Sequence, residues 1–565
     1  MPISATNVVR VAFGILAVVA LVTGYVGLDD FLASQSSQSS QLATGFDLLY
    51  WDIQLFVLDS VASDGGQLPA TLQFARFAAP AVTIFTLVDG ARLLFAAELR
   101  RIRARESRDH VVVCGSGAVT IALVERLREN AERVVVISSA PATAPGDRRV
   151  LHVSGDARNP ATLRAAGTQR ATRLYACEAD SSTNTAIALA AHSLSRRGTD
   201  TPLSAYAYIP DPDLCAALRA RRLSLAGRSR LRLDFFNLDE LAARVLLERH
   251  PVLNDQPIVV MGLDTFGCAL LVEVAKRRRL DTSSSERLPI TVVDDNAAQT
   301  GAALCRRFEF LPEVCEITFH DAEPDDPRLA EILPAGSPQR VFVCYADQDL
   351  ALKTALTSIR LWCCGPGSLI VRVEQAATFG RAFQDVRLLE GIAGALHIFA
   401  INEEAGDPRL IGEDLVETLA RAIHDRYLLE AAGRRENLQS NTSMASWERL
   451  PDRLKNANRR QAEDIGRKLA SIGCALAPRV EPGLAFSFKE QEIERLAVME
   501  HDRWLTELVR HGWTQGPERD SVRLRHPDLD RWENLSEVAR EKDRDTVRNL
   551  PCILSDAGFQ IVRIT

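Results

Sequence analysis

Two long apolar stretches dominate the N-terminal part of the chain. Residues 8–28 carry a single charge, Arg10, and residues 77–97 form a second apolar run that contains Asp89 and Arg92. Because about 20 apolar residues are enough to cross a bilayer as a helix, both stretches are predicted to be transmembrane helices. A charge within a span is costly, so Asp89 and Arg92 are expected to face water, a helix bundle or each other.

A shorter apolar and aromatic run lies between the two stretches, at residues 46–61. It is too short to span a membrane and is typical of a re-entrant or interfacial helix. Residues 1–108 are therefore predicted to form a two-helix, pore-like membrane unit in which Asp52, Gln54 and Asp59 belong to the pore. The alternative is an inert anchor whose short helix lies on the membrane surface.

The charges around these stretches predict an orientation. Residues 27–74 hold six aspartates and no lysine or arginine, whereas residues 92–108 are rich in arginine. By the positive-inside rule the arginine-rich end of the second span lies in the cytoplasm, so both chain termini are expected there and the acidic segment outside. A signal peptide at residues 8–28 would instead export the cysteine-bearing remainder of the chain. We therefore expect a multi-pass protein of the cell (inner) membrane.

Beyond residue 109 short apolar strands alternate with helices. The segment 110–138 runs from a strand through Gly115 and Gly117 into a helix and a second strand, as in a nucleotide-binding βαβ unit. The first glycine permits the tight turn, and the second permits a phosphate to approach the helix N-terminus. The second strand ends in Ser138 rather than in the acid that would bind a ribose hydroxyl, and Asp156 follows the third strand.

A second unit of the same kind begins at residue 257. Its turn contains Gly262 and Gly267, and its second strand ends in Asp294 and Asp295, but Asp264 replaces the middle glycine. The glycine loop and the acidic residue are thus kept in complementary halves of the chain. The residues of the two units together predict that the protein binds NAD or another adenine nucleotide.

These two units are predicted to be tandem α/β Rossmann-like domains, at residues 109–251 and 252–411. The segments GSGAVT, VSGDARNPATLRAAGTQRATRLYAC and NTAIALA of the first unit resemble the TrkA-N or RCK domain, the ligand-binding regulator of potassium channels and transporters. The segment 236–244 looks like that family's crossover helix. The resemblance implies a channel-like homotetramer that binds NAD, ATP, ADP or divalent ions. The TVGYG filter of potassium channels is absent from the sequence.

No group of residues argues for catalysis or for a metal site. A hydride-transfer enzyme needs a placed acid or base in a substrate-handling domain. Four histidines of the two Rossmann-like units are scattered through the sequence without a partner pattern: His152, His192, His250 and His320. We therefore expect a protein that is not an enzyme.

Beyond residue 412 the pattern is helical and repeats itself. The same series of residues occurs twice: His424, Trp447, Arg459 and Gly473 correspond to His501, Trp532, Arg544 and Gly558. The spacings from tryptophan to arginine and to glycine are equal in the two copies, whereas the second copy has eight additional residues between histidine and tryptophan. A shared register of distinct residues is the mark of an internal repeat. We predict two all-α repeats, at residues 412–489 and 490–565.

The second repeat contains the segments HDRW, GWTQGPERD, HPDL, WENL and KDRDTV. These resemble the RyR domain, the helical repeat of ryanodine receptors, and the first repeat is a partial match that lacks the GWTQGP loop. Aromatic side chains beside charged ones could stack on a nucleobase, so the candidate ligand residues are His501, Asp502, Arg503, Trp504 and Trp513. The alternative is that the tryptophans belong to the core and the charged residues brace helices.

The composition agrees with a large, mostly intracellular protein. The 565 residues are 46% hydrophobic and 25% charged, which indicates several folded domains rather than disorder, and the net charge of −7 gives no reason to expect a nucleic-acid partner. All eleven cysteines lie at or beyond Cys114 without CxxC spacing, as in a reducing compartment. Our leading hypothesis is a ligand-gated, potassium-channel-like cation channel subunit that senses a nucleotide-type ligand. The alternative is a membrane-anchored nucleotide sensor or effector without a pore.

Overall fold

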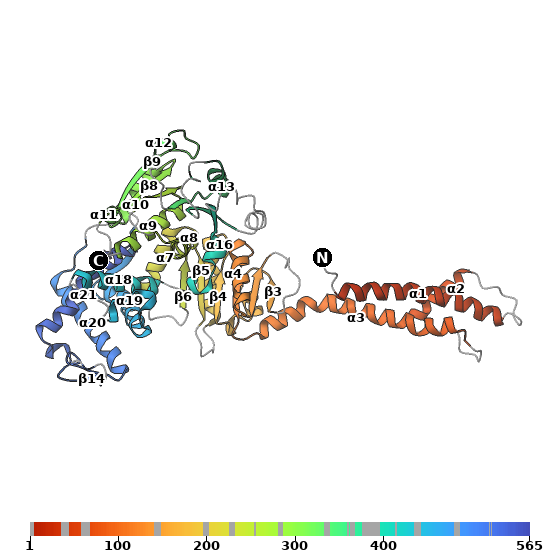
Figure 1. The fold of residues 1–565 in the computed structure, drawn as a ribbon. Coiled ribbons are helices and arrows are strands. Elements are labelled where there is room, and N and C mark those ends of the chain that lie inside the picture. The colour runs from red at the N-terminus through yellow and green to blue at the C-terminus, as the bar shows by residue number, and fades with distance from the viewer. Residues whose placement is uncertain are drawn as a thin grey trace. The chain divides into compact units, whose positions relative to one another are not determined.

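The structure of the chain is a computed structural model (Figure 1). It describes residues 5–35, 45–57, 68–139, 149–195, 203–224, 232–252, 256–280, 286–332, 340–358, 361, 368–375, 396–412, 415–433, 442–479, 486–518, 520 and 523–564. The chain divides into two compact units, Met1–Arg103 and Ala104–Thr565, which we call the N-terminal unit and the C-terminal unit.

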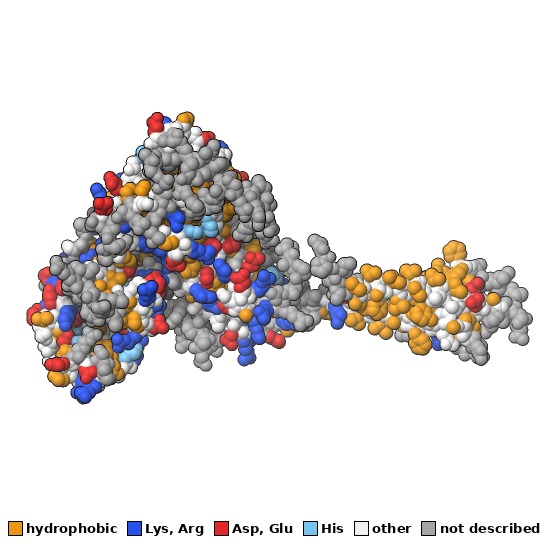
Figure 2. All heavy atoms as spheres, in the orientation of Figure 1, with side chains coloured by type: hydrophobic (Ala, Val, Ile, Leu, Met, Phe, Trp, Pro, Cys, Tyr) orange, Lys and Arg blue, Asp and Glu red, His pale blue; other side chains and the backbone are white. Residues whose placement is uncertain are grey.

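The described part of the N-terminal unit is helical. Its elements are α1 (Ala5–Gln35), α2 (Gly45–Gln54), the 3-10 turn η1 (Leu55–Val57) and α3 (Ala70–Glu106), whose last turn belongs to the C-terminal unit. The stretches Val8–Ala33 of α1 and Ala70–Arg92 of α3 are long and apolar enough to cross a membrane. Hydrophobic side chains gather over these helices in Figure 2, in contrast to the mixed charges of the C-terminal unit.

Helices α1 and α3 run antiparallel and contact each other through charged and aromatic side chains. Nε of Arg10 lies 2.9 Å from Oδ2 of Asp89, and the rings of Phe13 and Phe85 stack with their centroids 3.9 Å apart. The ion pair neutralises the charge of Asp89, which the sequence places within the second span. Its partner is Arg10 on the other helix and not Arg92, which is exposed.

Two glycines bring the helices close together farther along α1. A methyl group at Gly27 would lie 2.6 Å from the backbone nitrogen of Leu72, and one at Gly24 would lie 3.3 Å from the methyl group of Ala75. Small residues permit such backbone approach between apolar helices, where van der Waals packing supplies most of the attraction.

The C-terminal unit begins with a six-stranded parallel sheet in the order β3-β2-β1-β4-β5-β6. Its strands are β1 (Val111–Cys114), β2 (Val134–Ser138), β3 (Val150–Ser154), β4 (Arg173–Ala176), β5 (Ser204–Tyr208) and β6 (Arg232–Phe236). The connections are α4 (Ala118–Glu129), α5 (Pro160–Ala165), η2 (Thr168–Arg170), α6 (Ser181–Ser195), α7 (Pro212–Ser224) and α8 (Leu238–Arg249). All four residues of β1 are buried, as expected for a parallel strand covered on both faces.

A second parallel sheet has the equivalent order, β9-β8-β7-β10-β11-β12. Its strands are β7 (Ile258–Met261), β8 (Leu288–Asp294), β9 (Cys315–Asp321), β10 (Arg340–Val343), β11 (Leu369–Val373) and β12 (Leu396–Ala400). The helices are α9 (Thr265–Leu280), α10 (Ala297–Arg307), α11 (Leu311–Val314), α12 (Leu329–Ile332), α13 (Gln348–Thr357), α16 (Ile401–Ala405) and α17 (Pro408–Ile411). Both sheets therefore have the doubly wound Rossmann order, and the predicted tandem is confirmed.

The two Rossmann-like domains share one hydrophobic core rather than a loose linker. Helix α8 packs on both α9 and α16, and its buried residues Leu241 and Leu246 belong to the same cluster as Leu270 and Ile401. Asn237 begins α8, where its side-chain oxygen accepts a hydrogen bond from the backbone N–H of Glu240.

The remaining elements form two repeats. The first contains α18 (Leu415–Gly433), η4 (Thr442–Met444), η5 (Trp447–Arg449), α19 (Asp452–Ser471) and β13 (Cys474–Pro478), and the second contains α20 (Glu490–Arg510), β14 (Thr514–Gln515), β15 (Arg525–His526), η6 (Trp532–Asn534), α21 (Glu537–Asp556) and β16 (Phe559–Arg563). The region is mainly helical, as predicted, but each repeat also ends in a strand. These strands, β13 and β16, pair antiparallel with each other. Gly473 and Gly558, which precede them, have φ of +68° and +83°.

Candidate functional site

The glycine turn of the first sheet opens at the carboxyl end of β1. Gly115 has φ of +142°, and a methyl group there would lie 2.7 Å from the carbonyl oxygen of Cys177, so the backbone itself requires this glycine. Gly117 begins α4 with nothing within 4 Å of the place where a methyl group would project. The first turn of α4 has no acidic residue. This helix N-terminus is open and suited to an anion.

Asp156 and Arg158 follow β3 at the same edge of the sheet. The exposed Arg158 guanidinium donates two hydrogen bonds from Nε and Nη2 to the Asp156 carboxylate and holds its pKa below the usual range. Beyond β4, hydrogen bonds from Ser182 and Thr183 lower the pKa of Asp180 to about 2. The residues at this edge fit a nucleotide held by its phosphates, but they offer no acid at the end of β2 for a ribose.

The residues of the equivalent loop in the second sheet contact other parts of the protein. A methyl group at Gly262, which has φ of +93°, would lie 2.6 Å from the Tyr345 nitrogen, and one at Gly267 would lie 2.2 Å from the Gly262 oxygen. Asp264, in place of the middle glycine, accepts a hydrogen bond from the backbone N–H of Ala346. The glycines of this loop are therefore explained by packing.

The acids at the end of β8 also act within the protein. Oδ2 of the buried Asp294 accepts a hydrogen bond from the Leu263 N–H at 2.8 Å, and its Oδ1 accepts one from the Asn296 N–H at 3.0 Å. Asp295 is exposed, and the adjacent Asp294 carboxylate raises its pKa. With Asp264, these carboxylates place negative charge at the second edge, which disfavours a pyrophosphate close to them.

The predicted ligand residues of the second repeat form a braced cluster. Nε2 of the buried His501 lies 2.8 Å from the Asp530 carbonyl oxygen, and its Nδ1 lies 3.3 Å from Oδ2 of Asp543. Arg503 is paired with Glu500 and Glu507. Trp504 packs edge-on against His526 with ring centroids 5.0 Å apart, Trp513 is buried, and Asp502 is exposed.

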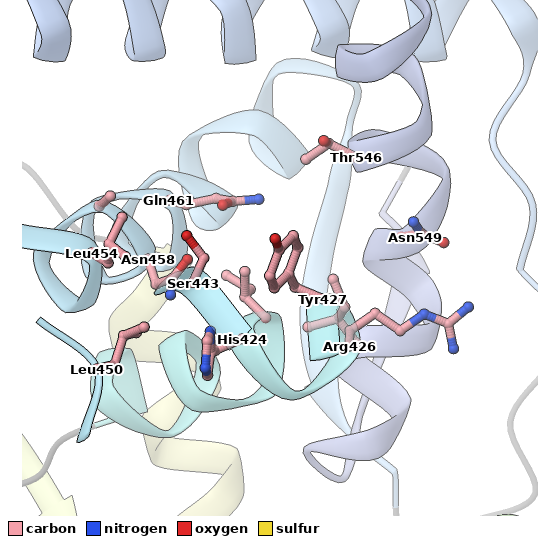
Figure 3. Close-up of a pocket in the computed structure, with 13 residues that line it drawn as sticks. His424, Arg426, Tyr427, Ser443, Leu450, Leu454, Asn458, Gln461, Thr546 and Asn549 are labelled. Carbon is pink, nitrogen blue, oxygen red and sulfur yellow. The ribbon is translucent and has the colours of Figure 1, made fainter. Parts of the chain in front are cut away.

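A pocket of about 290 Å³ lies instead in the first repeat, where α18 and α19 meet α21 (Figure 3). Its polar lining residues are His424, Arg426, Tyr427, Ser443, Asn458, Gln461, Thr546 and Asn549. Figure 3 shows Tyr427 between the polar side chains of α19 and those of α21. Amide side chains beside an aromatic ring are the groups that read and stack a nucleobase, and Arg426 could meet a phosphate.

The equivalent position of the second repeat holds paired charges. Glu500 and Arg503 stand where the first repeat has Ile423 and Arg426. The buried Lys468 of α19 and Arg503 both form ion pairs with Glu500.

The difference between the two repeats at this position can be recognised in the sequence. The segment between histidine and tryptophan is eight residues shorter in the first repeat and lacks the GWTQGP loop. In the second repeat that loop supplies Trp513 and leads to His526, which packs against Trp504. The absence of the loop could have directed attention to Tyr427, the counterpart of Trp504.

Comparison with known proteins agrees with the predicted resemblances. Residues 111–218 match the TrkA-N domain. Residues 487–563 match the RyR domain. The first Rossmann-like domain is thus a TrkA-N domain, and the second repeat is an RyR domain.

Solved structures similar to the chain include the GsuK channel. A GsuK structure bound to ADP is 15% identical, covers 72% of this chain and 96% of its own length, and has a TM-score of 0.37. A GsuK channel bound to NAD is 13% identical, covers 83% of this chain and 85% of its own length, and has a TM-score of 0.36. These values are too low to carry a functional assignment. No curated protein sequence matches the chain.

The TrkA-N domain holds the end of α3. Ala104 is fully buried in the domain core, and the Arg170 guanidinium donates a hydrogen bond to the carbonyl oxygen of Arg105. Gly167 has φ of +69°, and a methyl group there would lie 2.7 Å from the Ala104 oxygen. Nε2 of the buried His110 lies 2.9 Å from the Ala166 oxygen. The helix that contains the second apolar stretch is therefore anchored in the domain.

Of the predicted pore residues, Asp52 is fully buried within the N-terminal unit, Gln54 is half-buried at the end of α2, and Asp59 lies outside the described residues. No group of three or more His, Cys, Asp or Glu able to hold a metal occurs in the part of the chain that the structure describes.

Proposed function

We propose that this chain is a non-enzymatic, membrane-bound regulator in which a nucleotide bound by the C-terminal unit acts on α3 of a potassium-channel-like assembly. The observation that carries the proposal is the burial of the last turn of α3 in the TrkA-N domain. Because α5 begins just after Asp156 and Arg158 and leads to Gly167, a ligand at that sheet edge would sit one short helix away from the end of α3.

Two positions support a nucleotide-type ligand. The edge with Gly117 and Arg158 offers an open helix N-terminus and a guanidinium, which suit phosphates. The pocket with Tyr427 and Gln461 offers the ring and amides that suit a base. NAD or another adenine nucleotide is our proposed ligand at the first edge, and a homotetramer in the cell (inner) membrane, with both termini in the cytoplasm, is our proposed assembly.

Reconstitution of the full chain in liposomes tests this function. We expect potassium flux that changes severalfold when ADP, ATP or NAD is added on the side of the C-terminal unit, and we expect chemical crosslinking to yield tetramers. Arg158→Gln should weaken the nucleotide effect without altering flux in its absence. Flux that is absent with every nucleotide would contradict the channel.

A membrane-anchored sensor without a pore is the second candidate, because Asp52 is buried rather than presented to a water-filled path. It predicts that nucleotides raise the unfolding temperature of the full chain in detergent while no flux is observed. A chain that neither conducts nor binds any nucleotide would exclude both functions.

A further inference from the structure

Asp52 of α2 lies inside the small helical core of the N-terminal unit. Its side chain is fully buried, and a methyl group at Gly24 of α1 would lie only 2.0 Å from its Oδ1. The carboxyl group therefore rests directly on the backbone of α1, where the glycine leaves room for it. The surrounding buried residues of α1, α2 and α3 are hydrophobic: Ala20, Leu28, Leu48, Leu55, Leu72, Ala75, Ala78 and Ala79.

Neither carboxyl oxygen of Asp52 has a hydrogen-bond partner among the described residues. The arginines of the packed helices do not neutralise it, because Arg10 of α1 is paired with Asp89 and Arg76 and Arg92 of α3 are exposed. The other titratable side chains on the neighbouring turns of the three helices are also exposed: Tyr25, Asp29, Asp30, Asp47 and Tyr50. The buried carboxyl is thus surrounded mainly by apolar side chains and by the backbone of α1.

An ionised carboxylate in such surroundings is very costly, because hydrocarbon replaces its hydration without supplying a partner. A metal cation would neutralise the charge, but it needs several oxygen ligands, and the described walls supply none beyond the aspartate. A proton neutralises the charge without further ligands. The resulting acid O–H can donate to a helix carbonyl, which Gly24 leaves accessible.

We propose that Asp52 is a proton-binding site of the N-terminal unit and stays a neutral carboxylic acid in the folded protein at a pH where an exposed aspartate is already ionised. Loss of this proton would place an unpaired charge against the backbone of α1 at Gly24, so the packing of the helices around Asp52 depends on pH. This inference concerns the helices themselves and holds with or without ion conduction.

Infrared spectroscopy of the full chain in lipid nanodiscs, recorded across a pH series, tests the site directly. The wild type should show the C=O stretch of a protonated carboxylic acid at about pH 5.5, where an exposed aspartate is largely ionised, and this band should disappear as the pH is raised. Asp52→Asn should lose part of the band, whereas Asp47→Asn, which alters an exposed acid on the same helix, should keep its full intensity. A band that is absent from the wild type, or whose intensity is unchanged in Asp52→Asn, would overturn the proposal.

Unfolding provides the second readout. Because the folded carboxyl holds its proton to higher pH than an unfolded aspartate, which titrates near pH 4, the unfolding temperature of the wild type should fall as pH rises. Asp52→Asn should reduce this fall, and the part that His501 contributes should remain. If the variant does not fold, the infrared titration of the wild type still decides the question. A wild-type band that responds to potassium rather than to pH would reveal a cation site instead.

Discussion

Histidines His424 and His501 occupy equivalent positions in the two repeats, yet they titrate in opposite directions. Burial lowers the pKa of His424. Burial also acts to lower the pKa of His501, but hydrogen bonds to Asp543 and to the Asp530 carbonyl outweigh it and raise the pKa. The difference follows from one substitution between the repeats, because the counterpart of Asp543 in the first repeat is Asn458.

Asp543→Asn should therefore make the protein less stable, and more so in acid than at higher pH. Since the folded pKa of His501 is raised, the stabilisation is fully present below the unfolded value of about 6.5 and is lost as pH rises through the folded pKa. We expect a loss of about 1–2 kcal/mol of unfolding free energy below about pH 6 and a smaller loss at higher pH. Denaturant unfolding across a pH series checks this, and Asn458→Asp should create the same dependence at His424. A pH-independent loss in Asp543→Asn would contradict the assignment.

Two glycines of the TrkA-N domain should respond differently to alanine. Gly167→Ala should cost about 1–2 kcal/mol from the left-handed backbone alone, and more from the contact with the Ala104 oxygen. Gly117→Ala, at φ of −78°, should change the unfolding free energy by less than about 1 kcal/mol. Thermal unfolding of the two variants compares them. Equal losses would mean that the end of α3 is not held as described.

The sequence predicted the positions of loops better than the roles of their side chains. The turns at Gly115 and Gly262 lie where the patterns placed them. Asp294, predicted as a ribose acid, lies at the end of β8 as expected, and its oxygens accept hydrogen bonds from Leu263 and Asn296. A residue type at the end of a strand does not specify whether a ligand or the neighbouring loop uses its oxygens, because that depends on where the loop backbone turns.

The helices α19 and α20 are joined by a buried charge. Lys468 is 1% exposed and forms ion pairs with Glu500 of α20 and, at 3.4 Å, with Asp464 on its own helix. Glu500 also accepts a hydrogen bond from Arg503 at 2.6 Å. Because these charges are desolvated, each depends on its partners far more than a surface pair does.

Glu500→Gln should consequently destabilise the repeats by about 3 kcal/mol, since it leaves Lys468 and Arg503 short of negative charge in a buried place. The matched control is Glu541→Gln, which removes a half-exposed partner of Arg544 and Arg548 and should cost less than about 1 kcal/mol. Chemical denaturation of the full chain measures both. Similar small losses would show that the Lys468 pair is as accessible to water as the surface one.

The sequence predicted which helices and sheets are present better than it predicted where each helix begins and ends. The periodic patterns placed α1, α3 and both Rossmann-like sheets, but α3 extends from residue 70 to residue 106 rather than over 77–97. Its arginine-rich end remains helical because arginine is a good helix former. The strands β13 and β16 were missed because each is only five residues long and its hydrogen-bonding partner lies in the other repeat, so no local hairpin marks them as a sheet.

The whole C-terminal unit is held together by contacts between its parts. Helix α7 of the TrkA-N domain places Ala216, Ala220 and Leu223 in the same core cluster as Cys474 and Leu476 of β13. Ion pairs between the parts join Arg307 to Asp213, Arg279 to Asp556 and Arg249 to Glu404. A substitution that disrupts one domain should therefore also lower the stability of the others.

Ala220→Glu tests this integration. The substitution places an unpaired charge beneath β13 and should cost about 3 kcal/mol or more, with faster proteolysis of the repeats. Leu214→Glu, on an exposed part of the same helix, should leave proteolysis unchanged. Limited proteolysis of the full chain with mass analysis of the fragments compares the two. Repeats that stay protected in Ala220→Glu would mean that they do not depend on α7.

The shared strand pair β13–β16 has a consequence during synthesis on the ribosome. Strand β13 emerges first, yet its hydrogen-bonding partner is translated a whole repeat later. Until then the edge of β13 and the apolar surface beside it stay open, at the stage when nascent chains are most prone to misassembly. Folding of the first repeat is thus completed only after the second has been made, and a ribosome that stalls between them leaves an unfinished domain for chaperones or proteases.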